Sequence, residues 1–163
     1  MGETGTMKIP PVFQPFIAAV KNAFSYLERD YGFRLTVQRA LGSEAWVTYE
    51  NQTTRIIVHY ELGAEPWVEI GRLELRDGQV VQPASIGLDL LLRERAKPLD
   101  DEVKVPRDIG ESEISLMVSV RANRLRALGD DLLRGDFRSF PKLQSKAEKE
   151  LQRRETEIFG SDA

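Results

Sequence analysis

The stretch that decides the fold runs from Glu44 to Leu75 and reads EAWVTYENQTTRIIVHYELGAEPWVEIGRLEL. Apolar and polar residues alternate in three successive segments of this stretch, and a period of two residues places alternate side chains on opposite faces of a β-sheet. Two turn-forming sequences separate the segments, Asn51-Gln52 and Gly63-Ala64-Glu65-Pro66. Short turns of this kind join antiparallel neighbours, so we expect three strands that pair in chain order as a meander.

The two faces of this expected sheet differ in character. The core face is expected to carry Val47, Tyr49, Thr54, Ile56, Val58, Tyr60, Leu62, Val68 and Ile70. The second face is mixed and is expected to carry Trp46, Thr48, Ile57, His59, Glu61, Trp67 and Glu69. A fully solvated face rarely carries two tryptophans and an isoleucine. We therefore expect the C-terminal helices to cover it, whereas a single helix on the opposite face would leave it open for a partner.

Further elements extend the sheet on both sides. Apolar residues recur at three- and four-residue spacing from Pro15 to Asp30, which predicts an N-terminal helix. Residues 33–39 alternate as a first strand. After Leu75 the Asp77-Gly78 pair is typical of a tight hairpin turn, so we expect Val80 and Val81 to form a short fifth strand that Pro83 ends.

The C-terminal half is predicted to be helical. Helical spacing and capping residues indicate three helices, at 85–95, at 112–133 with a weak point at Gly129, and from Phe137 to about residue 160. The fold class is therefore α+β, with an N-terminal helix, an antiparallel meander of four to five strands and three C-terminal helices packing on the sheet. We expect a flexible segment over residues 1–9 and a single domain over residues 10–160.

Composition limits the chemistry that the chain can perform. The 163 residues are 41% hydrophobic and 30% charged, include no cysteine and carry a net charge of −3. Without cysteine there is no disulfide, thiolate metal site or cysteine nucleophile. The N-terminus lacks the basic and apolar regions of a signal peptide, and no apolar run is long enough to span a membrane. We therefore expect a cytoplasmic protein.

Neither a catalytic residue nor a metal or cofactor site can be assigned from the sequence. His59 is the single histidine, and the strand pattern places it beside Glu61 and near Glu69, as a general base would require. A lone strand histidine is, however, more often a hydrogen-bonded structural residue. No serine lies in a Gly-x-Ser-x-Gly motif, and no glycine-rich phosphate loop is present. We expect a protein that is not an enzyme.

Two charged segments are candidates for binding. The loop over residues 97–110 carries Asp100 and Asp101, which lack the spacing of a calcium loop and are more typical of a solvated surface. The last helix carries a basic stripe of Lys142, Lys146, Lys149 and Arg153 on one face. Such a stripe can follow a phosphate backbone, but interleaved glutamates make a solvated helix face the simpler interpretation, and net charge makes nucleic acid an unfavoured partner.

Several short sequences in order resemble those of small bacterial proteins of unknown function, some of them similar to immunity proteins of polymorphic toxin systems. They are Tyr31-Gly32-Phe33, Val47-Thr48-Tyr49-Glu50-Asn51, Ile57-Val58-His59-Tyr60-Glu61, Val68-Glu69-Ile70-Gly71-Arg72-Leu73 and Leu132-Leu133-Arg134-Gly135-Asp136-Phe137. No functional residue is carried over from the resemblance. It implies a non-enzymatic cytosolic protein that binds another protein.

The hypothesis that results is an immunity-like protein-binding module. The candidate contacts are Trp46, His59, Glu61, Trp67 and Glu69 on the second sheet face, or Asp100 and Asp101 in the loop. Acidic residues outnumber basic ones between residues 31 and 83, seven to five, which favours a basic partner. The alternatives are nucleic-acid binding through the basic stripe and a small-molecule pocket between sheet and helices.

Overall fold

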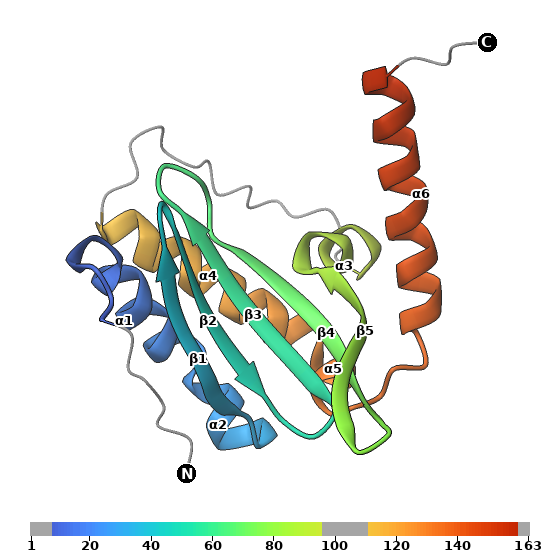
Figure 1. Ribbon diagram of the computed structural model, residues 1–163, viewed down its shortest axis with the longest axis horizontal. Coiled ribbons are helices and arrows are strands. Elements are labelled where there is room, and N and C mark those ends of the chain that lie inside the picture. Colours follow the sequence, from blue (N-terminus) through green and yellow to red (C-terminus); the bar gives the residue numbers. More distant parts are fainter. Residues whose placement is uncertain (1–7, 96–110, 160–163) are drawn as a thin grey trace.

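The computed structural model describes residues 8–95 and 111–159, which form one antiparallel sheet with helices packed on it (Figure 1). The strands are β1 (Arg34–Leu41), β2 (Glu44–Glu50), β3 (Thr54–Glu61), β4 (Trp67–Arg76) and β5 (Gln79–Gly87). The helices are η1 (Pro11–Phe13), α1 (Gln14–Ala23), α2 (Ser25–Tyr31), α3 (Leu88–Arg95), α4 (Glu111–Leu128), α5 (Asp130–Leu133) and α6 (Phe140–Phe159). The strand order is β1-β2-β3-β4-β5, which confirms the predicted α+β meander.

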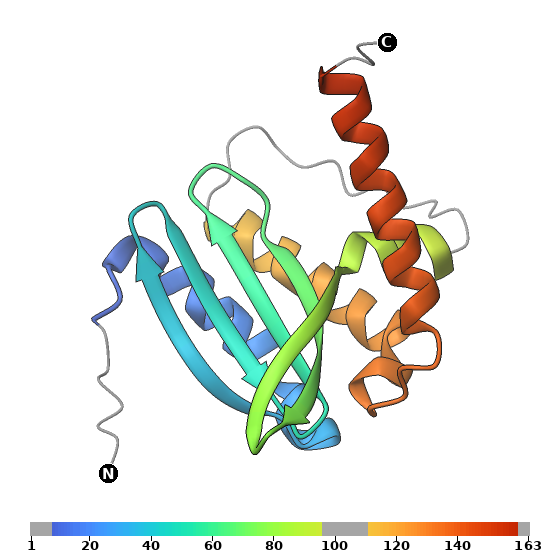
Figure 2. The ribbon, with the colours of Figure 1, turned by 45° about the vertical axis from the view of Figure 1, so that its right-hand side comes forward.

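The predicted core face packs against the N-terminal helices and α4, which lie behind the sheet in Figures 1 and 2. The rings of Phe13 and Phe16 contact the ring of Tyr60 on β3, with centroids 6.4 and 5.1 Å apart. Phe16, Ile56 and Val58 are fully buried. Each large apolar side chain removed from water in this way contributes roughly 1.5–3 kcal/mol to folding, so this layer is the main source of stability.

The N-terminal helix is interrupted at Phe24, where a continuous helix was expected. Phe24 has φ −93° and ψ 10°, outside the helical range, and separates α1 from α2. The break redirects the chain so that Phe24, Tyr26 and Leu27 are all buried. Tyr26 then donates a hydrogen bond of 2.8 Å from its hydroxyl to the carbonyl of Ala122 on α4. Burial of both segments outweighs the lost helical continuity.

The prediction that Pro83 ends the fifth strand was wrong. The Asp77-Gly78 turn forms as expected, with φ of 50° and 77°, but β5 continues through Pro83 to Gly87. Proline lacks an N–H group and is therefore tolerated on an edge strand, and β5 is the last strand in the order. The following helix accordingly begins at Leu88 and not near Ser85.

Of the C-terminal helices, α3 and α6 contact the edge strand β5, and α3 also contacts α4. The break at Gly129 divides the expected helix into α4 and α5, and a Cβ there would approach the Leu125 carbonyl oxygen to 2.9 Å. Arg95 at the end of α3 connects α3 to both α4 and α5. Its guanidinium donates to both carboxylate oxygens of Asp131 in α5, at 2.6 and 2.9 Å. It also donates to the carbonyl of Leu128 and to the hydroxyl of Ser139.

The second face of the sheet is not covered as expected. α6 rises beside β5 and α3, and over β1–β3 Figure 2 shows none of the helices drawn in colour. Among the C-terminal helices, α3 and α6 pack at the β4–β5 side, whereas α4 packs on α1 in the layer behind the sheet. We call the uncovered surface the open face, defined by Arg39, Trp46, Thr48, Ile57, His59, Glu61, Trp67 and Glu69.

Two further expectations concern the N-terminal segment and membrane-spanning helices. Most of the segment expected to be flexible, residues 1–9, lies outside the described residues, but Ile9 packs against the core. No helix within residues 8–95 and 111–159 combines the length and the apolar character that crossing a membrane requires.

Candidate functional site

The central feature of the open face is a row of side chains in contact across four strands. Arg39, Trp46, His59 and Trp67 occupy directly paired positions on β1, β2, β3 and β4. Side chains at paired positions lie on the same face about 4.5–5.5 Å apart at Cβ. The guanidinium carbon of Arg39 lies 4.5 Å from the Trp46 ring centroid. The ring of His59 lies 5.2 Å from that of Trp46 and 4.5 Å from that of Trp67.

His59 is the interior member of this row. Only 5% of the His59 surface is exposed. Its Nε2 lies 3.1 Å from Oε1 of Glu44, which accepts the hydrogen bond. An indole lies beside the imidazole on each side, and Nε2 is already occupied. A general base needs an open path to a substrate proton, so this geometry suits a structural role in which His59 spaces and orients the two tryptophans.

Trp67 is the exposed end of the row. It remains 55% exposed, whereas Trp46 is only partly accessible. The adjacent β3–β4 turn also exposes Leu62. An indole held against a neighbouring ring and accessible on its outer side resembles the rigid aromatic anchors found at protein interfaces.

Carboxylates border this exposed indole. Glu61 and Glu69 lie on the same face as Trp67, and within the described part of the chain neither forms an ion pair. Glu69 accepts only a long hydrogen bond of 3.4 Å from the amide of Gln82. Farther along the face the charges are balanced, because Arg55 donates to Glu50 at 2.7 Å and to Gln82 at 3.0 Å. The negative potential is therefore concentrated near Trp67.

A groove of about 370 Å³ continues from Trp67 towards α6. We call it the Trp67 groove; it is bounded by Trp67, Glu69, Ser85, Gly87, Asp89, Arg121 and Ala147, with apolar residues of β4, β5 and α3 behind them. Arg121 is its cation, and its guanidinium pairs with Glu65 at 2.8 Å. The groove is thus aromatic and apolar, with an acidic rim.

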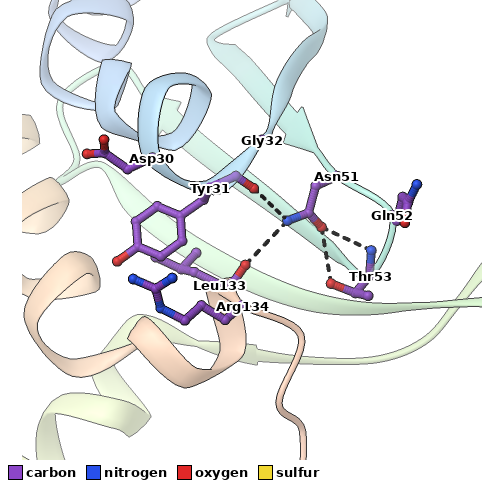
Figure 3. A pocket seen from close by; sticks show the side chains of 8 residues that line it. All are labelled: Asp30, Tyr31, Gly32, Asn51, Gln52, Thr53, Leu133 and Arg134. Atoms are coloured by element: carbon purple, nitrogen blue, oxygen red, sulfur yellow. Dashed lines mark hydrogen bonds between the residues drawn. The ribbon is translucent and has the colours of Figure 1, made fainter.

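A second cavity, of about 500 Å³, lies at the opposite end of the sheet between α2, the β2–β3 turn and α5 (Figure 3). Its centre is Asn51, whose amide donates to the carbonyls of Tyr31 and Leu133 at 3.3 Å each. Its carbonyl oxygen accepts the backbone N–H groups of Thr53 and Thr54 at 3.0 and 2.8 Å. Asn51 therefore ties three segments of the chain together.

The charged groups of this second cavity are satisfied within the protein. Asp30 pairs with Arg126 at 2.9 Å, and Arg134 pairs with Asp130 at 3.1 Å. The hydroxyl of Tyr31 also donates to Asp130, at 2.5 Å. The hydrogen bond to Tyr31, followed by that to Arg134, lowers the pKa of Asp130. With its charges paired, the cavity offers fewer free groups to a ligand than the Trp67 groove does.

The predicted basic stripe on α6 is partly neutralised. Lys146 is ion-paired with Glu94 of α3, and the neighbouring Glu150 pairs with Arg93 at 2.6 Å. Lys142, Lys149 and Arg153 are exposed. Pairing of the central lysine breaks the continuous positive surface that a phosphate backbone would follow.

The sequence-derived candidates for partner binding divide into two groups. Trp46, His59, Glu61, Trp67 and Glu69 lie together on the open face, as the alternation predicted. Asp100 and Asp101 lie outside the described residues. Among the residues that are described, no three His, Cys, Asp or Glu side chains come together as metal ligands would.

Sequence reasoning missed several residues of the site. Arg39 and Glu44 contact rings of the row. The position of Arg39 follows from extending the hairpin register to β1, and that of Glu44 from the period of two along β2. Gly87 was assigned to a helix because Pro83 was taken as the end of the sheet, whereas Asp89 does lie in α3 but was not expected to border a groove. Arg121 comes from a helix distant in sequence, and no local signal places it in the groove.

Comparisons of this chain with protein families, with curated proteins and with solved structures give no match.

Proposed function

We propose that this chain is a non-enzymatic cytosolic protein that binds another protein through the part of the open face around Trp67. The observation that carries the proposal is the half-exposed indole of Trp67, held against the ring of His59 with the two centroids 4.5 Å apart. Tryptophan is strongly enriched among the residues that dominate binding energy at protein interfaces. Because the ring is already positioned, little side-chain entropy is lost on binding.

The energy available from this indole is substantial. An aromatic side chain presents about 150–250 Å² of surface, and roughly half of the Trp67 surface is still accessible. At about 25 cal/mol per Å², covering the accessible half would contribute about 2–3 kcal/mol. A contribution of this size corresponds to a change of roughly 30- to 150-fold in affinity.

The charge around Trp67 supports a basic partner. Glu61 and Glu69 are not neutralised by ion pairs with other described residues, and the nearby Arg121 is paired with Glu65. Acidic groups at the rim of an interface accelerate association with a positively charged protein and weaken in effect as salt screens them. An immunity-like role, in which the chain occupies a basic protein, is consistent with this surface and with the sequence resemblance.

The direct test is affinity capture from the native lysate with the whole chain and with Trp67→Ala, after nuclease treatment and at low and high salt. We expect a discrete protein that survives nuclease, is recovered less at high salt and is lost with Trp67→Ala. Recovery that depends on intact nucleic acid, and that is lost on charge reversal at Lys142 and Lys149, would support the basic-stripe alternative instead. Equal recovery with Trp67→Ala would rule out the open face as the binding surface.

A small-molecule site is the second candidate, because two cavities of suitable size lie between sheet and helices. Pockets that bind small molecules commonly have volumes of about 300–1,000 Å³. Exposure of the chain to a metabolite mixture, followed by mass spectrometry of retained compounds, would test it. A compound retained by the wild type and by Trp67→Ala alike would point to the Asn51 cavity.

A further inference from the structure

The Trp67 groove has three features that together select one kind of ligand group. Its volume of about 370 Å³ is enough for a single long side chain. The indole of Trp67 forms part of its wall, and Glu69 and Asp89 bring carboxylates to its rim. An aromatic face beside carboxylates attracts an organic cation, by cation–π attraction and by ion pairing.

The net charge of the groove is negative. Arg121 is the cation at its wall, but the residue's side chain is only 15% exposed and its guanidinium pairs with Glu65 at 2.8 Å. The groove and its rim carry three carboxylates, those of Glu65, Glu69 and Asp89, and one guanidinium, that of Arg121. The balance is an excess of two negative charges. A cation entering the groove therefore meets attraction on balance.

The floor of the groove is open at Gly87. This residue is paired with Glu69 across β4 and β5, and a Cβ added to it would meet no atom within 4 Å. Two residues further along β4, by contrast, a Cβ on Gly71 would come 2.5 Å from Cδ of Gln82. The side chain of Gln82 therefore closes the groove beyond Glu69, and the space lies between Gly87, Trp67 and α6.

We propose that the Trp67 groove holds an arginine side chain of the protein partner, stacked on the Trp67 indole and ion-paired with Glu69 and Asp89. This inference rests on the proposed protein-binding function and specifies the group that is recognised. Arginine fits better than lysine because its planar guanidinium stacks on an indole and can donate to two carboxylates at once.

The experiment uses the ¹⁵N-labelled whole chain and two capped tripeptides, Gly-Arg-Gly and its neutral isostere Gly-citrulline-Gly. The readout is the indole N–H signal of Trp67, assigned by its loss in Trp67→Phe. We expect saturable shifts with the arginine peptide and binding at least about fivefold weaker with the citrulline peptide, because citrulline keeps the shape and loses the charge. No shift with the arginine peptide, or equal binding of the two, would overturn the inference.

Matched variants locate the binding. Glu69→Gln removes a groove carboxylate, and Glu28→Gln removes an exposed carboxylate on α2, away from the groove and the open face. Gly87→Leu fills the groove at a residue whose backbone does not require glycine and where a Cβ has room. We expect Glu69→Gln to weaken binding of the arginine peptide at least about threefold, Gly87→Leu to abolish it, and Glu28→Gln to leave it within about twofold.

The same variants separate this inference from the proposed function. Unchanged peptide binding in folded Gly87→Leu, with unfolding temperature confirming the fold, would place the cation elsewhere and overturn the inference. If Trp67→Ala abolishes partner capture while Gly87→Leu and Glu69→Gln do not weaken it, the protein-binding function stands and the arginine assignment fails.

Discussion

The rings of His59 and Trp67 lie with their centroids 4.5 Å apart, on residues that are directly paired between β3 and β4. His59 is nearly buried while Trp67 is half exposed. The imidazole therefore supports the inner side of an indole whose outer side is free. This cross-strand pair therefore presents a positioned and accessible aromatic surface.

Substituting His59 tests whether this support matters. In His59→Ala the indoles of Trp46 and Trp67 lose the ring between them, and Glu44 loses its hydrogen-bond partner. We expect a loss of about 1–3 kcal/mol in the free energy of unfolding, measured by urea denaturation. We also expect a red shift in tryptophan emission as water reaches the indoles. His59→Phe keeps a ring in place, so an equal emission shift in that variant would argue against the stacking role.

Two buried tyrosines should respond oppositely to loss of the hydroxyl. Burial raises the pKa of Tyr26 and that of Tyr49, so both stay protonated across the physiological range. Tyr26 donates to the Ala122 carbonyl, whereas the Tyr49 hydroxyl is buried with no hydrogen-bond partner in the described structure. We expect Tyr26→Phe to cost about 1 kcal/mol and Tyr49→Phe to be neutral or to stabilise by up to about 1 kcal/mol.

Thermal and urea unfolding of both variants would check this pair. Each substitution removes one oxygen atom and keeps the ring, so packing is held constant. A clear loss of stability in Tyr49→Phe would show that its hydroxyl is satisfied in solution.

The ion pair of Arg95 and Asp131 should make stability depend on acid pH. Partial burial alone would raise the pKa of Asp131, but the hydrogen bonds and charge of Arg95 outweigh it and lower that pKa below its usual range. The folded state then binds a proton less readily than the unfolded chain. The resulting stabilisation is complete above the unfolded pKa of about 3.9 and is lost as pH falls through the lower, folded value.

Asp131→Asn removes this dependence. The Asp131 side chain is 33% exposed, so after solvent screening we expect a cost on the order of 1 kcal/mol at pH 7. The difference in the free energy of unfolding between wild type and variant should shrink as the pH is lowered from 6 towards 2. A difference that is constant over this range would mean that the charge of Asp131 does not contribute.

Asn51 is predicted to be a structural residue and not a ligand contact. Its amide joins the end of α2 and the end of α5 to the β2–β3 turn through four backbone groups. We expect Asn51→Ala to cost about 2–3 kcal/mol in urea unfolding, because several partly buried groups lose their partner at once. Gln52→Ala, at an exposed neighbour lining the same cavity, should be within about 0.5 kcal/mol of wild type.

Local pattern predicted the parts of this fold that local physics controls. Alternation from Glu44 to Leu75 predicted the three central strands and the faces of Trp46, His59 and Trp67, and the Asp-Gly pair predicted the turn at residues 77 and 78. It failed where tertiary context decides. Pro83 is tolerated because β5 is an edge strand, and Phe24 breaks a helix because both halves can then be buried. Neither edge position nor burial is visible in the sequence around these residues.

The candidate site was likewise predictable only where local sequence pattern determines it. The open-face residues follow from the period of two, but whether helices would cover them depends on which side of the sheet α4 occupies. The Trp67 groove joins Glu69 to Arg121 and Ala147, residues that only the assembled helices bring together. A positive stripe was visible in the sequence, while the pairing of Lys146 with Glu94 was not.

The measurement that tests the central claim most directly is the affinity of the captured partner for three forms of the whole chain: wild type, Trp67→Ala and Leu75→Ala. Both variants truncate an exposed apolar side chain of β4, and Leu75 lies near the β4–β5 turn, away from the groove. By isothermal titration calorimetry we expect Trp67→Ala to weaken binding at least about 30-fold, with Leu75→Ala within about twofold of wild type. Equal affinities for wild type and Trp67→Ala would contradict the account.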